Sequence, residues 1–292
     1  MKDIAVYDLG KRARRKKAVT KTALYMLLIL ISVFLIFPYV FMLNRSFMTT
    51  QDVVSPNVYF FPRRITVDAY SRLFVGNGYF RNIWNTLRIV LLNMVIAPVA
   101  SSLCAYGFAR INFKGRKFVF AAVMSTMMIP GAIVQVPLYV MFTNLGMTGT
   151  FWPLVVPSFF GGGAINIFLL IQFMRNIPIE LDNAAKLDGL NVFQRFIRIC
   201  LPLCGPILFF VGVNTAIICW GDFYGPLIYL NNAKQYTLSI RIYLDSTRGF
   251  VAAYFANVRM AAGVFMSLIP LLIFAVYQRK LVDGIMIGAI KM

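Results

Sequence analysis

Residues 118–174 read FVFAAVMSTMMIPGAIVQVPLYVMFTNLGMTGTFWPLVVPSFFGGGAINIFLLIQFM, without a single charged side chain. This run is much too long for one crossing of a bilayer core, which needs about 20 apolar residues in a helix. Residues 143–150 (TNLGMTGT) interrupt the run with Gly, Asn and Thr, which favour a turn. We therefore expect two membrane-spanning helices here, near 118–142 and 151–174.

Further uncharged runs of spanning length occupy 22–43, 89–109, 199–221 and 260–278. Hydrophobic residues make up 60% of the 292-residue chain and charged residues 13%, about half the usual charged share of a soluble domain. This composition excludes a soluble globule and a disordered chain. The fold class predicted is an all-α integral membrane protein with six transmembrane helices. The first run is longer than a typical signal-peptide core and no A-x-A site follows it, so we expect it to remain as an anchor.

The charge balance is strongly basic, with 29 Lys and Arg against 10 Asp and Glu and a formal net charge of +19. In a soluble protein this excess would suggest nucleic acid as a partner. In a membrane protein the same excess holds loops on the cytoplasmic side, and we prefer this interpretation to nucleic-acid binding. Of the 29 basic residues, 19 lie in the two terminal tails, the 110–117 loop and the 175–198 segment. We therefore predict that both termini are cytoplasmic.

The spans divide the chain into five parts. They are a cytoplasmic basic tail (1–21), a first transmembrane helix (22–43), an extracellular segment (44–82), a five-helix core (83–279) with a cytoplasmic loop (175–203), and a cytoplasmic C-terminal tail (280–292).

The sequence contains few residues of the types that bind metals or catalyse reactions. There is no His, and the four Cys lie in or beside apolar runs without the acidic or His neighbours of a metal site. We expect no metal, no cofactor and no catalytic residue in this chain. A membrane enzyme would need a convergent acid, base or metal constellation, and the sequence contains few acids to build one.

The cytoplasmic segment 175–206 reads RNIPIELDNAAKLDGLNVFQRFIRICLPLCGP. Pro178 suits a helix start, and the acidic residues that follow complement the positive end of the helix dipole. Gly189 permits a sharp turn, and Asn191 with Gln194 has the spacing of a capping box that begins a second short helix. The segment is predicted to form a helix–turn–helix at the membrane surface. It could dock a cytoplasmic partner or rest on lipid headgroups, and periodicity alone does not decide between these.

The same segment resembles the conserved loop of permease subunits of ATP-binding-cassette (ABC) importers. That pattern is E-A-A, three residues, G, nine residues, I, one residue, L-P. Here the matching positions are Asn183-Ala184-Ala185, Gly189, Ile199 and Leu201-Pro202, with Asn183 in place of the usual Glu. The context is similar to the sugar-uptake branch, including the six-span permease type of the maltose transporter. The C-terminal Gln278-Arg279, Gly284 and Gly288-Ala289-Ile290-Lys291 also resemble that branch.

The resemblance implies a type I (MetI-like) importer permease in the plasma membrane of a bacterium. The short helix would insert into a groove on a separate ATPase subunit, and small side chains would allow close approach there. The residues implied for this contact are Glu180, Asp182, Asn183, Ala184, Ala185, Asp188 and Gly189 in the loop, and Gly288, Ala289 and Lys291 in the tail. The implied partners are a second homologous permease subunit, two ATPase subunits that bind ATP and Mg, an extracellular solute-binding protein, and a sugar, most readily an oligosaccharide. This chain has no phosphate-binding loop, so it would not hydrolyse ATP itself.

Polar and aromatic side chains around the fifth span are the candidates for a substrate path, because sugar sites combine aromatic rings with a few polar groups. The candidates are Asn214, Trp220, Asp222 and Tyr224. Each residue could instead bond a neighbouring helix or sit at the membrane interface.

Two other transport functions stay open. An ABC permease could carry a solute other than a sugar. An ion-coupled secondary carrier is disfavoured, because no span interior contains the Asp, Glu or His that such carriers use for the coupling ion.

Overall fold

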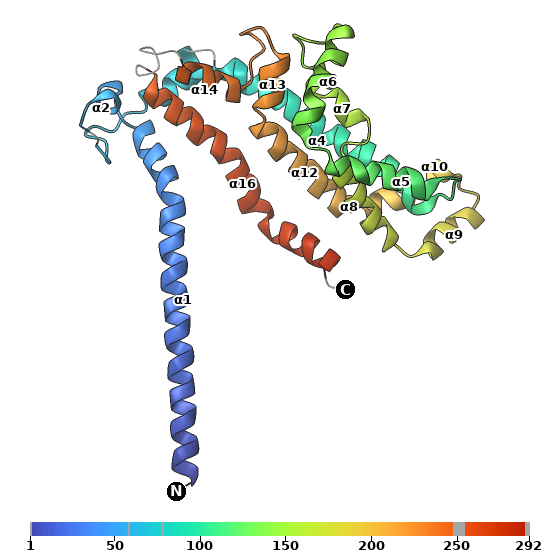
Figure 1. The fold of residues 1–292 in the computed structure, drawn as a ribbon, viewed down its shortest axis with the longest axis horizontal. Helices are drawn as coiled ribbons and strands as arrows, with labels where there is room; N and C mark the ends of the chain where they lie inside the picture. Colours follow the sequence, from blue (N-terminus) through green and yellow to red (C-terminus); the bar gives the residue numbers. More distant parts are fainter. Residues whose placement is uncertain (1, 58, 77–78, 248–254, 290–292) are drawn as a thin grey trace. The chain divides into compact units, whose positions relative to one another are not determined.

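The computed structural model describes residues 2–57, 59–76, 79–247 and 255–289, with side chains from residue 17 to residue 278 within these ranges. Every regular element in the described ranges is a helix (Figure 1). The elements are α1 (Lys2–Ser46), α2 (Thr50–Val54), α3 (Asp68–Ser71), η1 (Arg72–Gly76), α4 (Tyr79–Arg110), α5 (Arg116–Ser125), η2 (Thr126–Met128), α6 (Gly131–Asn144), η3 (Trp152–Leu154), α7 (Val156–Phe159), α8 (Ala164–Arg175), α9 (Ile179–Leu187), α10 (Val192–Arg195), η4 (Phe196–Cys200), α11 (Leu201–Leu203), α12 (Gly205–Gly221), α13 (Tyr224–Tyr229), α14 (Leu238–Thr247) and α16 (Ala256–Ala289).

The chain forms two compact units. One unit contains residues 1–72 with 250–264, and the other contains 73–249 with 265–292. In the first unit, Asn257 is fully buried, and its side-chain amide donates to the Met48 carbonyl at 3.2 Å. The second unit contains the candidate site.

Six membrane crossings fit the helices when each of two bent pairs counts as one. Four helices are long and apolar enough to cross alone: Lys17–Ser46, Tyr79–Arg110, Val156–Arg175 and Ala256–Gln278. The bent pairs are Arg116–Met128 with Gly131–Asn144, and Val192–Leu203 with Gly205–Gly221. Five of the six predicted spans fall within these elements, and the remaining one, predicted at 151–174, begins five residues before Val156–Arg175.

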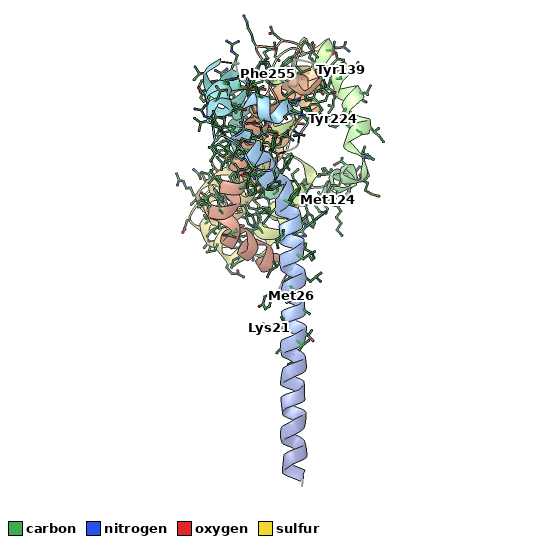
Figure 2. The ribbon with its side chains drawn as sticks, turned by 90° about the vertical axis from the view of Figure 1, so that its left-hand side faces the viewer. Lys21, Met26, Met124, Tyr139, Tyr224 and Phe255 are labelled. Atoms are coloured by element: carbon green, nitrogen blue, oxygen red, sulfur yellow. The ribbon has the colours of Figure 1, made fainter. Side chains whose placement is uncertain are left out.

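The basic tail and the first predicted span belong to one continuous helix. The predicted span at 22–43 lies inside α1, which is continuous from Lys2 to Ser46. Lys21 and Met26, labelled on α1 in Figure 2, are both exposed. No proline lies before Pro38 in α1, so the charged and apolar parts can continue as one helix.

The third predicted span is bent by 104° rather than straight. Pro130 lacks a backbone N–H, and Ile129 before it has extended dihedral angles (φ −84°, ψ 117°), so the helix ends there. Met124 on α5 and Tyr139 on α6 mark the two arms (Figure 2). The fifth span is likewise bent by 77° at the break before Gly205, which lies between Pro202 and Pro206.

The core of the second unit lies among α4, α8, η4 and α12, and α4 packs along both α8 and α12 (Figure 1). Leu170, Ile171 and Met174 of α8 are fully buried in it. At Gly212 of α12, a Cβ would lie only 2.9 Å from the Met94 carbonyl of α4. Glycine therefore permits a close helix approach at this point.

Polar side chains bind the helices of this unit to one another. Asn93 donates to the Leu154 carbonyl at 3.1 Å, and the Ser101 hydroxyl donates to the Gly161 carbonyl at 2.9 Å. Both side chains are almost completely buried. Such bonds replace solvent partners that are absent from an apolar environment.

Candidate functional site

The predicted helix–turn–helix is present at residues 179–195. Helix α9 begins after Pro178 and ends at Leu187. The Gly189 N–H donates to the Lys186 carbonyl at 3.1 Å, and the Leu190 N–H donates to the Ala185 carbonyl at 3.0 Å. This pair of bonds is a Schellman motif, and Gly189 has the positive φ (83°) that the motif requires. The sequence prediction of a sharp turn at Gly189 is confirmed.

The second short helix starts with the predicted capping box. The Asn191 side chain accepts from the Gln194 N–H, and the Gln194 side chain accepts from the Asn191 N–H, each at 2.9 Å. Two otherwise unpaired backbone donors are thereby satisfied. Fixed at both the turn and the cap, the segment is a short, rigid element.

An ion pair attaches α9 to the core of the unit. Arg110, at the end of α4, lies with its guanidinium Nη1 3.2 Å from Asp182 Oδ2, and the two side chains are 6% and 9% exposed. The Arg110 Nη2 also donates to the Met174 and Ile177 carbonyls, at 2.6 Å each. One buried guanidinium therefore joins the ends of α4 and α8 to the inner face of α9.

The structure divides the predicted contact residues between two faces of α9. Asp182 and Ala185 face inward and are 6% and 4% exposed. The others lie on the outer face or at the turn and are exposed: Glu180, Asn183, Ala184, Asp188 and Gly189. The resemblance implied that all seven approach a partner, but only these five are accessible. The two inward residues attach α9 to its own chain.

Two residues important to this element were not identified from the sequence. Leu187, the last residue of α9, is 89% exposed, more than any other large apolar side chain of the described residues, so its side chain is available to a partner. Arg110 was counted only as a topological charge. Helical spacing could have placed Leu187 on the same face as Asn183 and Ala184, which are four and three residues earlier. Nothing in the sequence pairs Arg110 with Asp182.

The C-terminal contact residues lie at the edge of the described chain. Gly288 and Ala289 are at the end of α16, and Lys291 lies outside the described residues.

The candidate substrate-path residues do not form one cluster with a common exposed face. Trp220 is 3% exposed, and its indole N–H donates to the Met266 carbonyl at 2.8 Å. Asn214 and Asp222 are partly exposed, and Tyr224 is 65% exposed (Figure 2). Trp220 therefore has a packing role, whereas Tyr224 is accessible to a solute.

Asp222 stabilises the start of the next helix. Its Oδ1 accepts a hydrogen bond from the Gly225 N–H at 3.2 Å, and its own carbonyl accepts from the Ser239 hydroxyl at 2.7 Å. Burial raises the pKa of the Asp222 carboxyl above its ordinary value, and the Gly225 and Tyr224 N–H groups oppose this shift. This residue therefore orders the chain after the fifth span.

The segment after α13 is joined to the N-terminal end of α4. The Asn82 amide donates to the Tyr236 carbonyl at 2.6 Å, and the Leu238 N–H donates to the Thr86 hydroxyl at 3.0 Å. Tyr79 donates to the buried carboxylate of Asp245 at 2.5 Å. This end of α4 is opposite to the Arg110 end that holds α9.

Comparison with known proteins matches residues 83–286 to a family described as the binding-protein-dependent transport system inner membrane component. A putative ABC transporter permease protein, ORF2 of Caldicellulosiruptor sp. (strain Rt8B.4), is 31% identical over 87% of this chain and 91% of its own. The galactooligosaccharides transport system permease protein GanQ of Bacillus subtilis (strain 168) is 30% identical over 91% of this chain and 94% of its own. A solved chain from a bacterial ABC transporter involved in import of the acidic polysaccharide alginate is 19% identical, with a TM-score of 0.79 over 91% of this chain and 97% of that one.

Proposed function

The chain belongs to the family of binding-protein-dependent transport system inner membrane components, and we propose that it moves an oligosaccharide across the bacterial plasma membrane, driven by ATP hydrolysis on partner subunits. The transport class follows from the family and from its multiple membrane-spanning helices. The cargo class is supported by relatives such as GanQ, whose name specifies galactooligosaccharides.

The observation that carries this proposal is the geometry of α9 and its turn. The element is short, and the Arg110–Asp182 ion pair attaches it to the rest of its unit. On its outer face, Ala184 and Leu187 are exposed to solvent. A rigid element with an apolar tip is suited to fit a groove on another protein and to transmit movement from it. The ion pair would pass that movement to α4, and the two carbonyl bonds would pass it to α8.

The proposed assembly contains a second homologous permease subunit, two ATPase subunits and an extracellular solute-binding protein. ATP and Mg would bind to the ATPase subunits, and this chain would contribute no catalytic group. With α9 on the cytoplasmic side, the Tyr79 end of α4 faces outward, and both termini are cytoplasmic.

Reconstitution tests the proposal directly. The chain is expressed with its partner permease, ATPase and binding protein, and uptake of labelled galactooligosaccharides into proteoliposomes is measured with ATP inside. We expect uptake to require internal ATP and to survive a protonophore or sodium ionophore. Uptake that persists without ATP and collapses with an ionophore would contradict the proposal and favour an ion-coupled carrier.

A further inference from the structure

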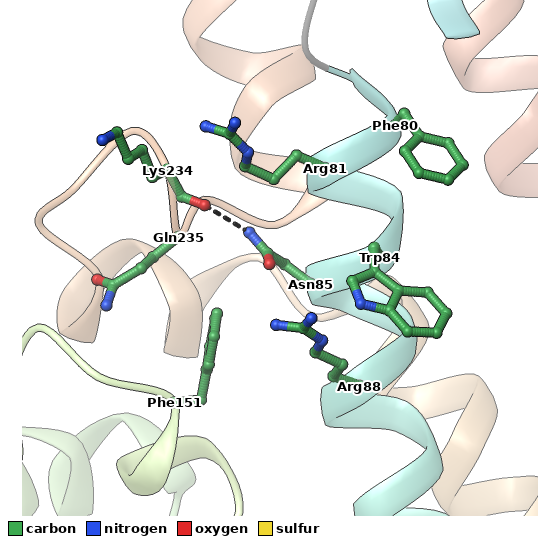
Figure 3. A pocket seen from close by; sticks show the side chains of 8 residues that line it. All are labelled: Phe80, Arg81, Trp84, Asn85, Arg88, Phe151, Lys234 and Gln235. Carbon is green, nitrogen blue, oxygen red and sulfur yellow. Dashed lines mark hydrogen bonds between the residues drawn. The ribbon is translucent and has the colours of Figure 1, made fainter.

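A cavity of about 430 Å³ lies between the first turns of α4 and the segment before α14 (Figure 3). All its lining residues belong to the second unit. Its volume falls within the range of small-molecule sites, about 300–1,000 Å³. The α4 residues that line the cavity, from Phe80 to Arg88, lie about 33–45 Å along the helix from Arg110, because α4 rises about 1.5 Å per residue. The cavity is therefore on the side from which an imported solute would enter.

The wall of this cavity is fixed by buried hydrogen bonds. Asn85, 3% exposed, donates its side-chain amide to the Lys234 carbonyl at 2.9 Å and to the Tyr236 carbonyl at 3.2 Å. The first of these bonds is drawn in Figure 3. The segment that carries Lys234 is thus held against α4, although about 150 residues separate them.

Three cationic side chains line the cavity: Arg81, Arg88 and Lys234 (Figure 3). No lining residue is acidic, and none of these three cations forms an ion pair with a carboxylate in the described ranges. All three residues are exposed, and together they create a positive electrostatic potential that attracts an anion to the cavity. Arginine is particularly suited to a carboxylate, because its planar guanidinium can donate two parallel hydrogen bonds.

The remaining lining groups suit a sugar ring. Trp84 and Phe151 present aromatic rings, on which the C–H face of a pyranose can stack. The Arg88 guanidinium lies 5.4 Å from the centre of the Trp84 ring. Gln235 also lines the cavity, and its half-buried side-chain amide can form a hydrogen bond with a hydroxyl group.

We propose that this cavity binds a carboxylate-bearing oligosaccharide, of the uronic-acid class, on its way into the transporter. Arg81, Arg88 and Lys234 would bind the carboxylates, and Trp84, Phe151 and Gln235 would bind the sugar rings. The inference rests on the proposed function and specifies its substrate: a neutral oligosaccharide would leave the three cations unneutralised.

The test uses the assembled transporter in nanodiscs of zwitterionic phosphatidylcholine, without the binding protein. Binding of trigalacturonate and of its neutral methyl ester is measured by calorimetric titration. We expect trigalacturonate to bind at least about tenfold more tightly than the ester, with an affinity that falls as salt rises. The double variant Arg81→Gln/Arg88→Gln should lose this preference, whereas Arg64→Gln, an exposed arginine outside the cavity, should retain it.

Equal binding of the acid and its ester, or an unchanged preference in the double variant, would overturn the proposal. So would a double variant that loses only anionic phosphatidylglycerol, measured by native mass spectrometry, or only the binding protein, measured by pull-down. ATP-driven uptake of trigalacturonate and of neutral galactooligosaccharide, each measured in proteoliposomes, separates the two claims. If either sugar is taken up while the acid preference is absent, only this inference fails; if neither sugar shows ATP-driven uptake, the proposed function fails.

Discussion

Replacing Leu187 with Glu should abolish ATP-driven uptake while leaving the chain folded. The side chain is 89% exposed, so its own subunit loses little on substitution. In the proposed complex the leucine is buried in a groove of the ATPase subunit, where full burial contributes about 1.5–3 kcal/mol. Glutamate would remove that contribution and bring an unpaired charge into the contact, at a further cost of a few kcal/mol. The measurements are ATPase co-purification, ATP hydrolysis and uptake in proteoliposomes.

Two matched variants make this result specific. Leu187→Met keeps an apolar side chain of similar volume and should retain most uptake. Leu145→Glu places the same charge at another exposed leucine, 59% exposed and far along the chain from α9, and should retain ATPase binding. If Leu187→Glu bound the ATPase and transported like the unsubstituted chain, the proposal that this turn docks onto the ATPase would be contradicted.

Substituting Arg110 with Ala should destabilise the transporter and stop uptake together. The change leaves Asp182 buried without its partner, and removal of one member of a buried pair costs about 3–5 kcal/mol. It also leaves the Met174 and Ile177 carbonyls without their donor. We expect a clear fall in the thermal unfolding midpoint of the assembled transporter, with α9 detached from α4 and α8. Arg110→Lys should recover only part of the loss, because an ammonium group cannot reproduce the guanidinium fork.

Arg175→Ala is the matched control, since Arg175 is the exposed last residue of α8, close in sequence to the same loop. It should leave the unfolding midpoint and uptake nearly unchanged. The double variant Arg110→Met/Asp182→Leu should regain part of the lost stability, because apolar groups can replace a buried pair at little cost, although the Met174 and Ile177 carbonyls still lack their donor. If Arg110→Ala were as stable and as active as Arg175→Ala, the ion pair would not hold the coupling element.

The sequence was sufficient for features that depend on neighbouring residues. The lack of charge in 118–174 located two spans, and the Asn191–Gln194 spacing predicted a cap that the structure contains. Gly189 likewise predicted the sharp turn that the structure contains at this position. These signals are local, because membrane burial, capping and turn geometry each act within one or two turns of helix.

Features that join distant parts of the chain were beyond such reasoning. Arg110 and Asp182 are 72 positions apart, and no local pattern distinguishes this arginine from one that merely marks a cytoplasmic loop. The inward orientation of Ala185 depends on the same attachment. The sequence contains a local signal for the 104° bend, because Ile129-Pro130-Gly131 is a helix-breaking sequence inside an otherwise apolar run. Apolar content identified the crossing but could not show that it is broken.

A photoreactive amino acid at position 187 tests the coupling role most directly. Position 145 provides a second exposed leucine site for comparison. In the assembled transporter, irradiation is predicted to join position 187 to the nucleotide-hydrolysing subunit, with a yield that changes between ATP-bound and nucleotide-free states, while position 145 does not join to it. Absence of any cross-link from position 187 to that subunit in every nucleotide state would contradict the proposal.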